Sequence, residues 1–185
     1  MIYSLENYLA HFYAMIQIKG SGFCLREWLL SDEASLIRYA DNPKVSQFLS
    51  DRFAYPYTAE YAQQWLNHQT QKTVIDNLVI DIDGELVGGI GIEFRQDIFR
   101  KTALLGYWLG EPFWGKGIMT EVVRLMVDYS FENFDLARIQ AGVFDSNPAS
   151  MRVLEKAGFI KEGIAKKALY KFGQFSDEHI YALTR

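Results

Sequence analysis

The amino-acid sequence predicts an α/β (α+β) fold in which one mixed, mostly antiparallel sheet is flanked by helices on both faces. Two β-type segments, 78–82 and 85–94, are separated by Asp83-Gly84, a residue pair typical of a two-residue antiparallel hairpin. The segment 102–144 then follows the order strand, helix, strand. Antiparallel strands followed by such a unit indicate a mixed sheet.

The composition indicates one globular domain spanning 1–185 and argues against two function classes. Hydrophobic residues make up 49% of the 185 residues and charged residues 23%, which is enough for one substantial core. The net charge of −4 argues against a nucleic-acid-binding protein, whose surface is normally basic. No apolar run approaches the ~18 residues that a membrane span needs, so no membrane partner is expected.

Cysteine and histidine usage narrows the chemistry. Cys24 is the only cysteine, so no internal disulfide can form, and a cytoplasmic location is expected. The three histidines, His11, His68 and His179, are scattered without metal-ligand spacing, so no metal site is expected.

Residues 1–20 form an N-terminal extension whose role the sequence leaves open. Four apolar residues there fall at helical spacing: Leu5, Tyr8, Leu9 and Phe12. This spacing favours a short helix packed on the domain or on a partner. Alternatively, Met15 is the true start of the protein.

The next segment predicts a strand followed by two helices. Residues 23–28 read as the first strand, and Ser31 as the N-cap of a helix with acidic residues in its first turn. Asn42-Pro43 ends that helix, and a second short helix is expected over 43–49. The apolar face of the first helix consists of Leu36, Ile37, Tyr39 and Ala40.

An aromatic loop, 52–57, precedes Thr58, which is expected to cap a helix over 59–69. Glycines at 88, 89 and 91 lie inside the strand 85–94 and predict a bulge or the close approach of another backbone. The central strand follows at 102–109, and its part 106–109 suits burial on both faces.

Two helices with clear boundaries complete the pattern. One begins at Ile118 and has a single apolar stripe consisting of Val122, Leu125, Met126 and Tyr129. The other begins at Asn147-Pro148, an N-cap followed by proline at the first helical position, and is closed by Gly158. The strand 138–144 lies between these helices, and 159–160 and 178–183 complete the sheet.

The loop before Ile118 is the strongest functional signal. Gly115 and Gly117 let the backbone turn directly into a helix N-terminus, where free amides and the helix dipole favour an anion. We therefore expect a pyrophosphate there. The loop lacks a Walker motif, and Thr120 replaces the third glycine of a dinucleotide fingerprint.

The segment FWGKGIMTE, 113–121, resembles the acetyl-coenzyme A loop of the GNAT N-acetyltransferases. The downstream segment NPASMRVLEKAGF, 147–159, resembles the branch that acetylates the N-termini of ribosomal proteins, including alanine N-termini. The resemblance covers 22–185. It implies a GNAT-like fold, acetyl-coenzyme A as cofactor and direct transfer to an amine in a ternary complex.

By this resemblance, a specific set of residues binds the cofactor. Asn147 would contact the pantetheine arm as well as capping its helix, and Lys116 and Arg152 could approach the phosphates or remain solvated. The predicted set is Trp108, Leu109, Trp114, Gly115, Lys116, Gly117, Ile118, Met119, Thr120, Asn147 and Arg152. Pro112 departs from the Gln or Arg that is usual at the head of this loop.

Catalytic roles follow partly from the same resemblance. A backbone N–H of the central strand, around Trp108 to Leu109, is expected to stabilise the oxyanion, and Ser150 to protonate the leaving thiolate. Many superfamily members have tyrosine in place of this serine. Glu93 is the first candidate for the general base, with a water relay as an alternative. Other candidates are Glu111, Glu121 and His179.

The acceptor is expected to be a primary amine, first a protein or peptide N-terminus and second a small amine such as a polyamine or an aminoglycoside. A longer acyl group is a further alternative. A rival of another class is a non-catalytic acyl-coenzyme A-binding module. The sequence leaves monomer and homodimer open.

Overall fold

The structure is a computed structural model, and it describes residues 15–185. One eight-stranded sheet runs in the order β1-β2-β3-β4-β5-β6-β8-β7, and every neighbouring pair is antiparallel except β5 and β6. The predicted mixed, mostly antiparallel sheet is confirmed. Its strands are β1 (Gln17–Gly20), β2 (Phe23–Arg26), β3 (Asn77–Ile82), β4 (Glu85–Phe94), β5 (Thr102–Leu109), β6 (Arg138–Phe144), β7 (Ile160–Lys171) and β8 (Gln174–Thr184).

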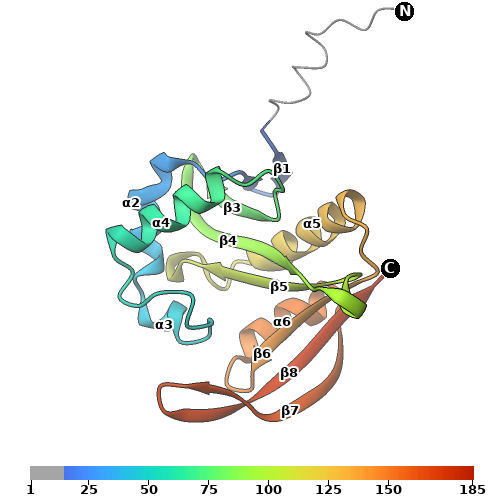
Figure 1. The fold of residues 1–185 in the computed structure, drawn as a ribbon. Helices are drawn as coiled ribbons and strands as arrows, with labels where there is room; N and C mark the ends of the chain where they lie inside the picture. Colours follow the sequence, from blue (N-terminus) through green and yellow to red (C-terminus); the bar gives the residue numbers. More distant parts are fainter. Residues whose placement is uncertain (1–14) are drawn as a thin grey trace, which may run out of the picture.

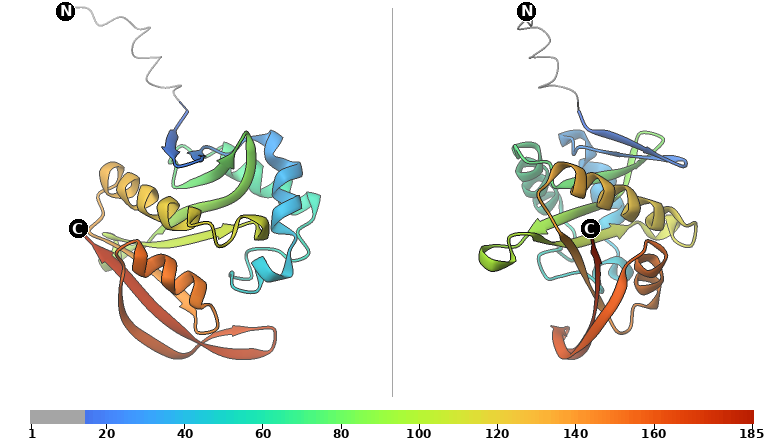
Figure 2. Two further views of the ribbon diagram at one scale, coloured as in Figure 1. Left: turned by 180° about the vertical axis from the view of Figure 1, so that it is seen from behind. Right: turned by 90° about the vertical axis from the view of Figure 1, so that its right-hand side faces the viewer.

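Helices cover both faces of this sheet (Figures 1 and 2). One hydrophobic core joins α5 and α6 to β4, β5, β6 and β8, and a second core joins α2 and α4 to β3 and β4. The helices are α2 (Glu33–Ala40), α3 (Pro43–Ser46), α4 (Ala59–Thr70), α5 (Ile118–Asn133) and α6 (Pro148–Lys156), with 3-10 turns η1 (Leu30–Asp32), η2 (Asp97–Phe99) and η3 (Glu111–Phe113). None of the helices within 15–185 is long and apolar enough to cross a membrane.

The N-terminal part differs from the prediction. The segment 23–28 is not the first strand, because β1 precedes it and pairs with β2 as a hairpin. The helix expected around Leu5 to Phe12 lies outside the described residues. The sequence did not identify β1, which pairs with β2, because four residues are too few for an alternating pattern to indicate a strand.

The start of α2 also differs from the prediction. Ser31 does not cap it but lies inside the 3-10 turn η1. The buried Asp32 stabilises this turn instead: its carboxylate accepts the Leu29 N–H at 2.9 Å and two hydrogen bonds from Arg26 at 2.9 and 2.7 Å. The second helix, α3, ends at Ser46 rather than at residue 49.

The β4 glycines allow the close approach that the sequence predicted. A Cβ on Gly88 would lie 2.5 Å from the Trp108 carbonyl oxygen of β5, and one on Gly91 would lie 2.1 Å from the Asn77 side-chain nitrogen. A register shift between Ile80 and Asp81 adds a bulge to the same region. These contacts hold β4 tightly between β3 and β5.

The expectation that 106–109 is buried on both faces is wrong. Leu104 is 36% exposed and Gly106 is exposed, whereas Ala103, Leu105 and Leu109 are buried against α5. The second core lies over β3 and β4 and reaches this part of β5 only at Trp108. We call the side of β5 and β6 opposite α5 and α6, which is exposed at Leu104, Gly106 and Gly142, the open face.

The hairpin of β7 and β8 is much longer than the two short strands that were expected. It turns at Phe172-Gly173, where both residues have positive φ, 51° and 77°. The tip carries exposed aromatic side chains: Tyr170, Phe172 and Phe175. The full length of these strands was not predicted because most of β7 is exposed and polar, without a regular apolar pattern.

β5 and β6 are paired over only three residues. The pairs are Thr102 with Arg138, Ala103 with Ile139 and Leu104 with Gln140. Figure 1 shows the two strands side by side at one end and separating toward the other. The sheet is therefore open in its middle, next to the C-terminal halves of both strands.

The buried cluster of Arg26, Asp32 and Asp81 is expected to dominate the polar contribution to stability. Side-chain exposure is 11%, 6% and 12%, respectively. Arg26→Ala leaves two buried carboxylates unpaired and should lower the free energy of unfolding by about 3–5 kcal/mol in urea denaturation. Arg38→Ala removes an exposed pair with Glu85 and should cost at most about 1 kcal/mol. Equal losses in the two variants would contradict this assignment.

Candidate active site

The hydrogen-bonding pattern of β5 decides which backbone groups point into the gap between β5 and β6. Gly110 N–H donates to Val87 of β4 at 2.8 Å, and the Thr102 carbonyl accepts from Arg95 at 3.0 Å. Backbone groups alternate along a strand, so even-numbered residues of β5 bond to β4 and odd-numbered residues face β6. The Leu109 N–H thus faces the gap, whereas that of Trp108 faces β4.

Two further contacts fix the end of β5. The Leu109 carbonyl accepts a hydrogen bond from the Trp114 indole at 2.7 Å, which ties the following loop back to the strand. The Trp108 ring lies on the other side of the sheet, 5.5 Å from the Phe53 ring. Of the two residues expected to supply the oxyanion donor, Leu109 has the required backbone direction.

The glycine loop leads into the N-terminus of α5 as the sequence predicted. Gly115 and Gly117 have φ of 74° and 81°, and no atom lies within 4 Å of a Cβ added at either position. Thr120 N–H bonds to the Gly117 carbonyl, which leaves the amides of Ile118 and Met119 directed out of the helix end. This accessible helix N-terminus, with its free amides and the positive end of the helix dipole, fits a pyrophosphate.

The two predicted cations near this loop are exposed. Lys116 lies with its ammonium 5.4 Å from the centre of the Phe113 ring, at the base of the loop. Arg152 is exposed on the first half of α6. Both positions allow contact with an anion at the end of α5, and neither side chain is held by an ion pair within 15–185.

Ser150 is held beside the gap by two neighbours. The Asn147 side chain accepts the Ser150 N–H at 3.1 Å and so caps α6, as predicted. The Ser150 hydroxyl lies 2.8 Å from the Tyr107 hydroxyl. Tyr107 extends from β5 to α6 and therefore bridges the two sides of the gap.

Burial raises the pKa of Tyr107 to about 12, and the hydrogen bond with Ser150 acts in the opposite, lowering direction. The phenol is therefore protonated at neutral pH and can donate to the Ser150 oxygen. Either hydroxyl can be the donor in this pair. When Tyr107 donates, the Ser150 proton is free to be donated into the gap. Tyr107 was not identified from the sequence. Its hydroxyl, in a strand expected to be fully buried, could have indicated a polar partner, because buried tyrosines usually need one.

Glu93 lies apart from these groups. Its side chain is 57% exposed and forms a 2.6 Å ion pair with Arg52. It is paired with Leu104, five residues before Leu109, which places it ~16 Å away along β5 at ~3.3 Å per residue. The structure therefore does not bring Glu93 together with Ser150 and the Leu109 amide.

The other candidate bases make structural contacts. The Lys44 ammonium, with the Asn42 amide, lowers the pKa of Glu111 by hydrogen bonding to it. Glu121 accepts two hydrogen bonds from Ser21, at 2.9 and 3.0 Å, and ties α5 to the β1–β2 turn. His179 lies against α6, with Nδ1 3.3 Å from the Met151 sulfur.

The aromatic loop 52–57 both covers the core and forms a pocket. Tyr57 is buried in the second core. Beside it is a pocket of about 210 Å³ between the loop and α4. Its walls are Arg52, Ala54, Tyr57, Tyr61, Gln64, Trp65 and His68.

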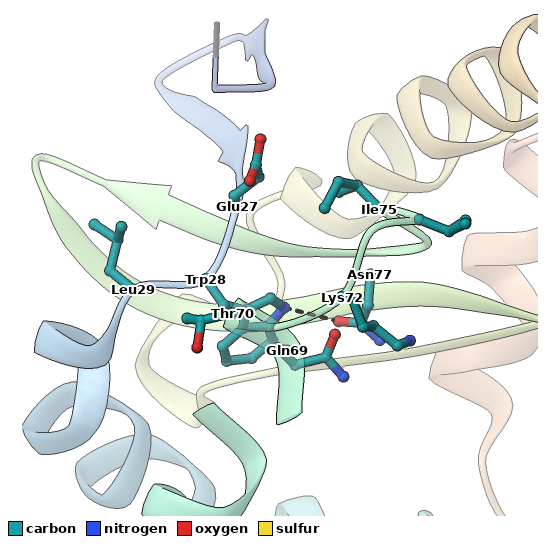
Figure 3. Close-up of a pocket in the computed structure, with 9 residues that line it drawn as sticks. Glu27, Trp28, Leu29, Gln69, Thr70, Lys72, Ile75 and Asn77 are labelled. Carbon is teal, nitrogen blue, oxygen red and sulfur yellow. Dashed lines mark hydrogen bonds between the residues drawn. The ribbon is translucent and has the colours of Figure 1, made fainter. Parts of the chain in front are cut away.

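A second cavity of about 210 Å³ lies between the C-terminus of α4 and the start of β3 (Figure 3). Two of its polar side chains are already paired: Trp28 Nε1 donates to Asn77 at 3.0 Å, and Glu27 accepts the Ile16 N–H at 2.8 Å. No lining residue comes from β5, β6, α5 or α6. We therefore assign the candidate active site to the gap between β5 and β6 rather than to this cavity. No group of three or more metal-ligating side chains occurs within 15–185.

Comparison with known proteins finds a family that matches most of the chain. The family described as the Acetyltransferase (GNAT) domain matches residues 23–160. Probable N-acetyltransferase YjcK of Bacillus subtilis is 54% identical over 101 residues, which are 55% of this chain and 56% of that protein. The alignment thus spans little more than half of that relative.

Two further matches extend over more of the chain. The ribosomal-protein-serine acetyltransferase of Escherichia coli is 31% identical over 124 residues, 61% of this chain and 69% of that protein. The structure of Mycobacterium smegmatis RimJ in complex with CoA-disulfide has a TM-score of 0.77 and 26% identity, covering 92% of this chain and 86% of that one.

The raised pKa of Tyr107 predicts a specific loss of stability at alkaline pH. Above pH 10 the unfolded tyrosine loses its proton while the native one keeps it, so the native state binds more protons and the free energy of unfolding falls as pH rises. Between pH 10 and 12 the free energy of unfolding of the wild type should fall by about 2–3 kcal/mol more than that of Tyr107→Phe. Near pH 8, where the tyrosine is protonated in both the native and the unfolded state, the variant should be about 1 kcal/mol less stable because it lacks the hydrogen bond to Ser150.

Urea unfolding at pH 8, 10 and 11.5 measures this difference. Tyr61→Phe, at a side chain that is 51% exposed, is the matched control and should follow the wild type. A constant difference between wild type and Tyr107→Phe at all three pH values would contradict the assignment.

Proposed function

Because the chain belongs to the GNAT acetyltransferase family, we propose that it transfers an acetyl group from acetyl-coenzyme A to a primary amine, most favourably the N-terminus of a protein or peptide. The transfer is direct, within a ternary complex. Cys24, the only cysteine, lies on β2, and β3 and β4 separate it from β5. No covalent acetyl-enzyme is therefore part of the proposal.

The observation that carries the proposal is the gap between β5 and β6. Three groups converge on it: the Leu109 N–H, the open N-terminus of α5 and the Ser150–Tyr107 hydroxyl pair. Acetyl-coenzyme A is a thioester with phosphate groups and a long pantetheine arm. Its binding site needs a place for the phosphates, a channel for the arm and hydrogen-bond donors at the thioester carbonyl. The gap offers these in a continuous arrangement.

The residues around the gap fit acetyl-coenzyme A. The amides of Ile118 and Met119 and the glycines of the loop would hold the pyrophosphate, with Lys116 and Arg152 close enough to add positive charge. Unpaired backbone groups of β5 would bind the pantetheine arm by strand-like hydrogen bonds. When bound, the thioester supplies the activated acetyl group.

Each polar group then has one role. The Leu109 N–H is positioned to donate to the carbonyl oxygen as negative charge develops there. Ser150 donates its proton to the departing sulfur, and the 2.8 Å hydrogen bond with Tyr107 keeps the Ser150 hydroxyl oriented. Asn147 fixes the backbone of Ser150 through the cap of α6.

The choice of a protein or peptide N-terminus rests on two supports. The relative from Escherichia coli is named a ribosomal-protein-serine acetyltransferase. The open face is also uncovered at Leu104, Gly106 and Gly142, and the exposed aromatic tip of the β7–β8 hairpin lies at the end of that face. An extended peptide end needs such an accessible surface, whereas a small amine is usually enclosed.

Cofactor binding is tested first by unfolding experiments. Acetyl-coenzyme A at a hundred times its Kd should raise the free energy of unfolding by about 2.7 kcal/mol. Gly117→Leu places a side chain at the helix end and should abolish this increase. Gly84→Leu is the matched control, because Gly84 has φ of 84° against 81° and equally open surroundings, but lies in the β3–β4 turn. If both variants keep the stabilisation, the phosphate is not bound at α5.

Ser150→Ala distinguishes an enzyme from a module that only binds acyl-coenzyme A. Loss of the proton donor should lower kcat by about 10²-fold or more, while stabilisation by acetyl-coenzyme A stays unchanged. The assay follows thiol release with peptides that begin with Ser or Ala, and with a polyamine and an aminoglycoside as small-amine probes. A wild type that binds acetyl-coenzyme A but acetylates none of these probes would favour the binding module.

A further inference from the structure

We propose that Glu178 of β8 is the carboxylate that binds the acceptor amine and takes its proton. This inference rests on the proposed acetyl transfer and concerns the same site. Glu178 was not among the general bases expected from the sequence, because it lies far from the glycine loop along the chain and no local pattern links the two.

The register of the sheet places Glu178 on the open face. The two residues next to it in the sequence have other contacts. Asp177 pairs with Lys166 of β7, and His179 packs on Met151 of α6, on the opposite side of the sheet. Side chains alternate along a strand, so Glu178 points away from α6. Its partner on β6 is Phe144, whose ring lies 6.2 Å from that of Phe48 on the same open face.

Glu178 is also level with the reacting end of β5. Leu104 is paired with Gln140, so continuing the parallel register puts Trp108 level with Phe144, and Phe144 is paired with Glu178. Glu93, in contrast, is level with Leu104, at the closed end of the gap. Of Glu93 and Glu178, both on the open face, Glu178 is therefore nearer to the Leu109 amide along the strand direction.

Gly142 holds the carboxylate in this position. A Cβ at Gly142 would lie 1.9 Å from the Glu178 Oε1 atom and 2.9 Å from its carboxyl carbon. The carboxylate therefore lies directly on the glycine backbone, two residues past the last residue of β6 that pairs with β5. Any larger residue at 142 would displace it from the gap.

The charge of Glu178 is available for a cation. Within 15–185 its carboxylate has neither an ion pair nor a hydrogen-bond donor, whereas Glu93 is neutralised by Arg52 at 2.6 Å. Two cations on the adjacent β7, Lys166 and Lys171, pair with Asp177 and Asp51 instead. A half-buried, unpaired carboxylate beside the gap attracts the positively charged form of an amine.

The chemistry requires a group of this kind. A free α-amine has a pKa near 8, so at neutral pH most of it is protonated and cannot attack a thioester. Glu178 binds the ammonium form and takes one proton, which passes to solvent and leaves a neutral amine. As the nitrogen of this neutral amine attacks, Glu178 accepts the second proton. The nitrogen–carbon bond forms, the carbon–sulfur bond breaks, and Ser150 gives its proton to sulfur. Solvent then returns the proton from Glu178 to Ser150, so one amine hydrogen is replaced by acetyl and coenzyme A leaves as the thiol.

The test combines turnover with amine binding. Octapeptides that begin with Ser or Ala are the acceptors, and the same peptides with acetylated N-termini are the reference ligands. Glu178→Gln should lower kcat/KM by about 10²-fold or more. In the presence of coenzyme A, it should weaken binding of the free-amine peptide by about 10-fold, with no change for the acetylated peptide. Stabilisation by acetyl-coenzyme A should stay the same.

Gly142→Ala displaces the carboxylate without removing it, and this position has no positive φ that would strain alanine. We expect a loss of the same kind, and the double variant should be no worse than Glu178→Gln alone. Glu132→Gln, at an exposed carboxylate near the end of α5, is the control and should match the wild type. Thermal unfolding confirms that each variant is folded.

The outcomes separate the two proposals. A wild type that acetylates the peptides, with Glu178→Gln within about two-fold of it in turnover and binding, overturns the role of Glu178 alone. Additive losses from Glu178→Gln and Gly142→Ala overturn it as well. A wild type that binds acetyl-coenzyme A but neither binds nor acetylates a free-amine peptide overturns both this role and the proposed acceptor class.

Discussion

The parallel pairing of β5 with β6 ends after three residues, and the remainder of the site depends on this early end. A continuous sheet would use every backbone N–H and C=O of both strands in its own ladder. Here the second half of β5 keeps those groups directed into a gap inside the protein. The separation is possible because α5 and α6 pack on one face and hold the two halves together through a shared core.

The gap divides the chemistry between the two faces of one sheet. The Ser150–Tyr107 pair and the glycine loop belong to the face covered by α5 and α6, where a long ligand arm can be enclosed. Glu178 belongs to the open face, where a larger partner can approach. In the proposed reaction the two substrates would meet between the strands, so neither would have to pass the other.

Local signals identified most of the fold but only part of the site. The Asp83-Gly84 turn, the helix after Gly117 and the cap at Asn147 each depend on residues within a few positions, and the structure contains all three. Tyr107 depends on its contact with Ser150, 43 residues away in the sequence, and Glu178 depends on its pairing with β6. Both contacts are set by the register of the strands, which local sequence signals do not specify. The same limit explains β1 and Asp32, which are defined by pairing with β2 and by the Arg26 side chain.

The order of strands has a consequence for synthesis on the ribosome. β8 follows β7 in the sequence but lies between β6 and β7 in the sheet, so β7 has no strand to join until β8 has been made. A domain generally folds as a unit. A nascent chain that still lacks 174–184 therefore has neither a partner for β7 nor Glu178, and the sheet can be completed only after this segment has emerged.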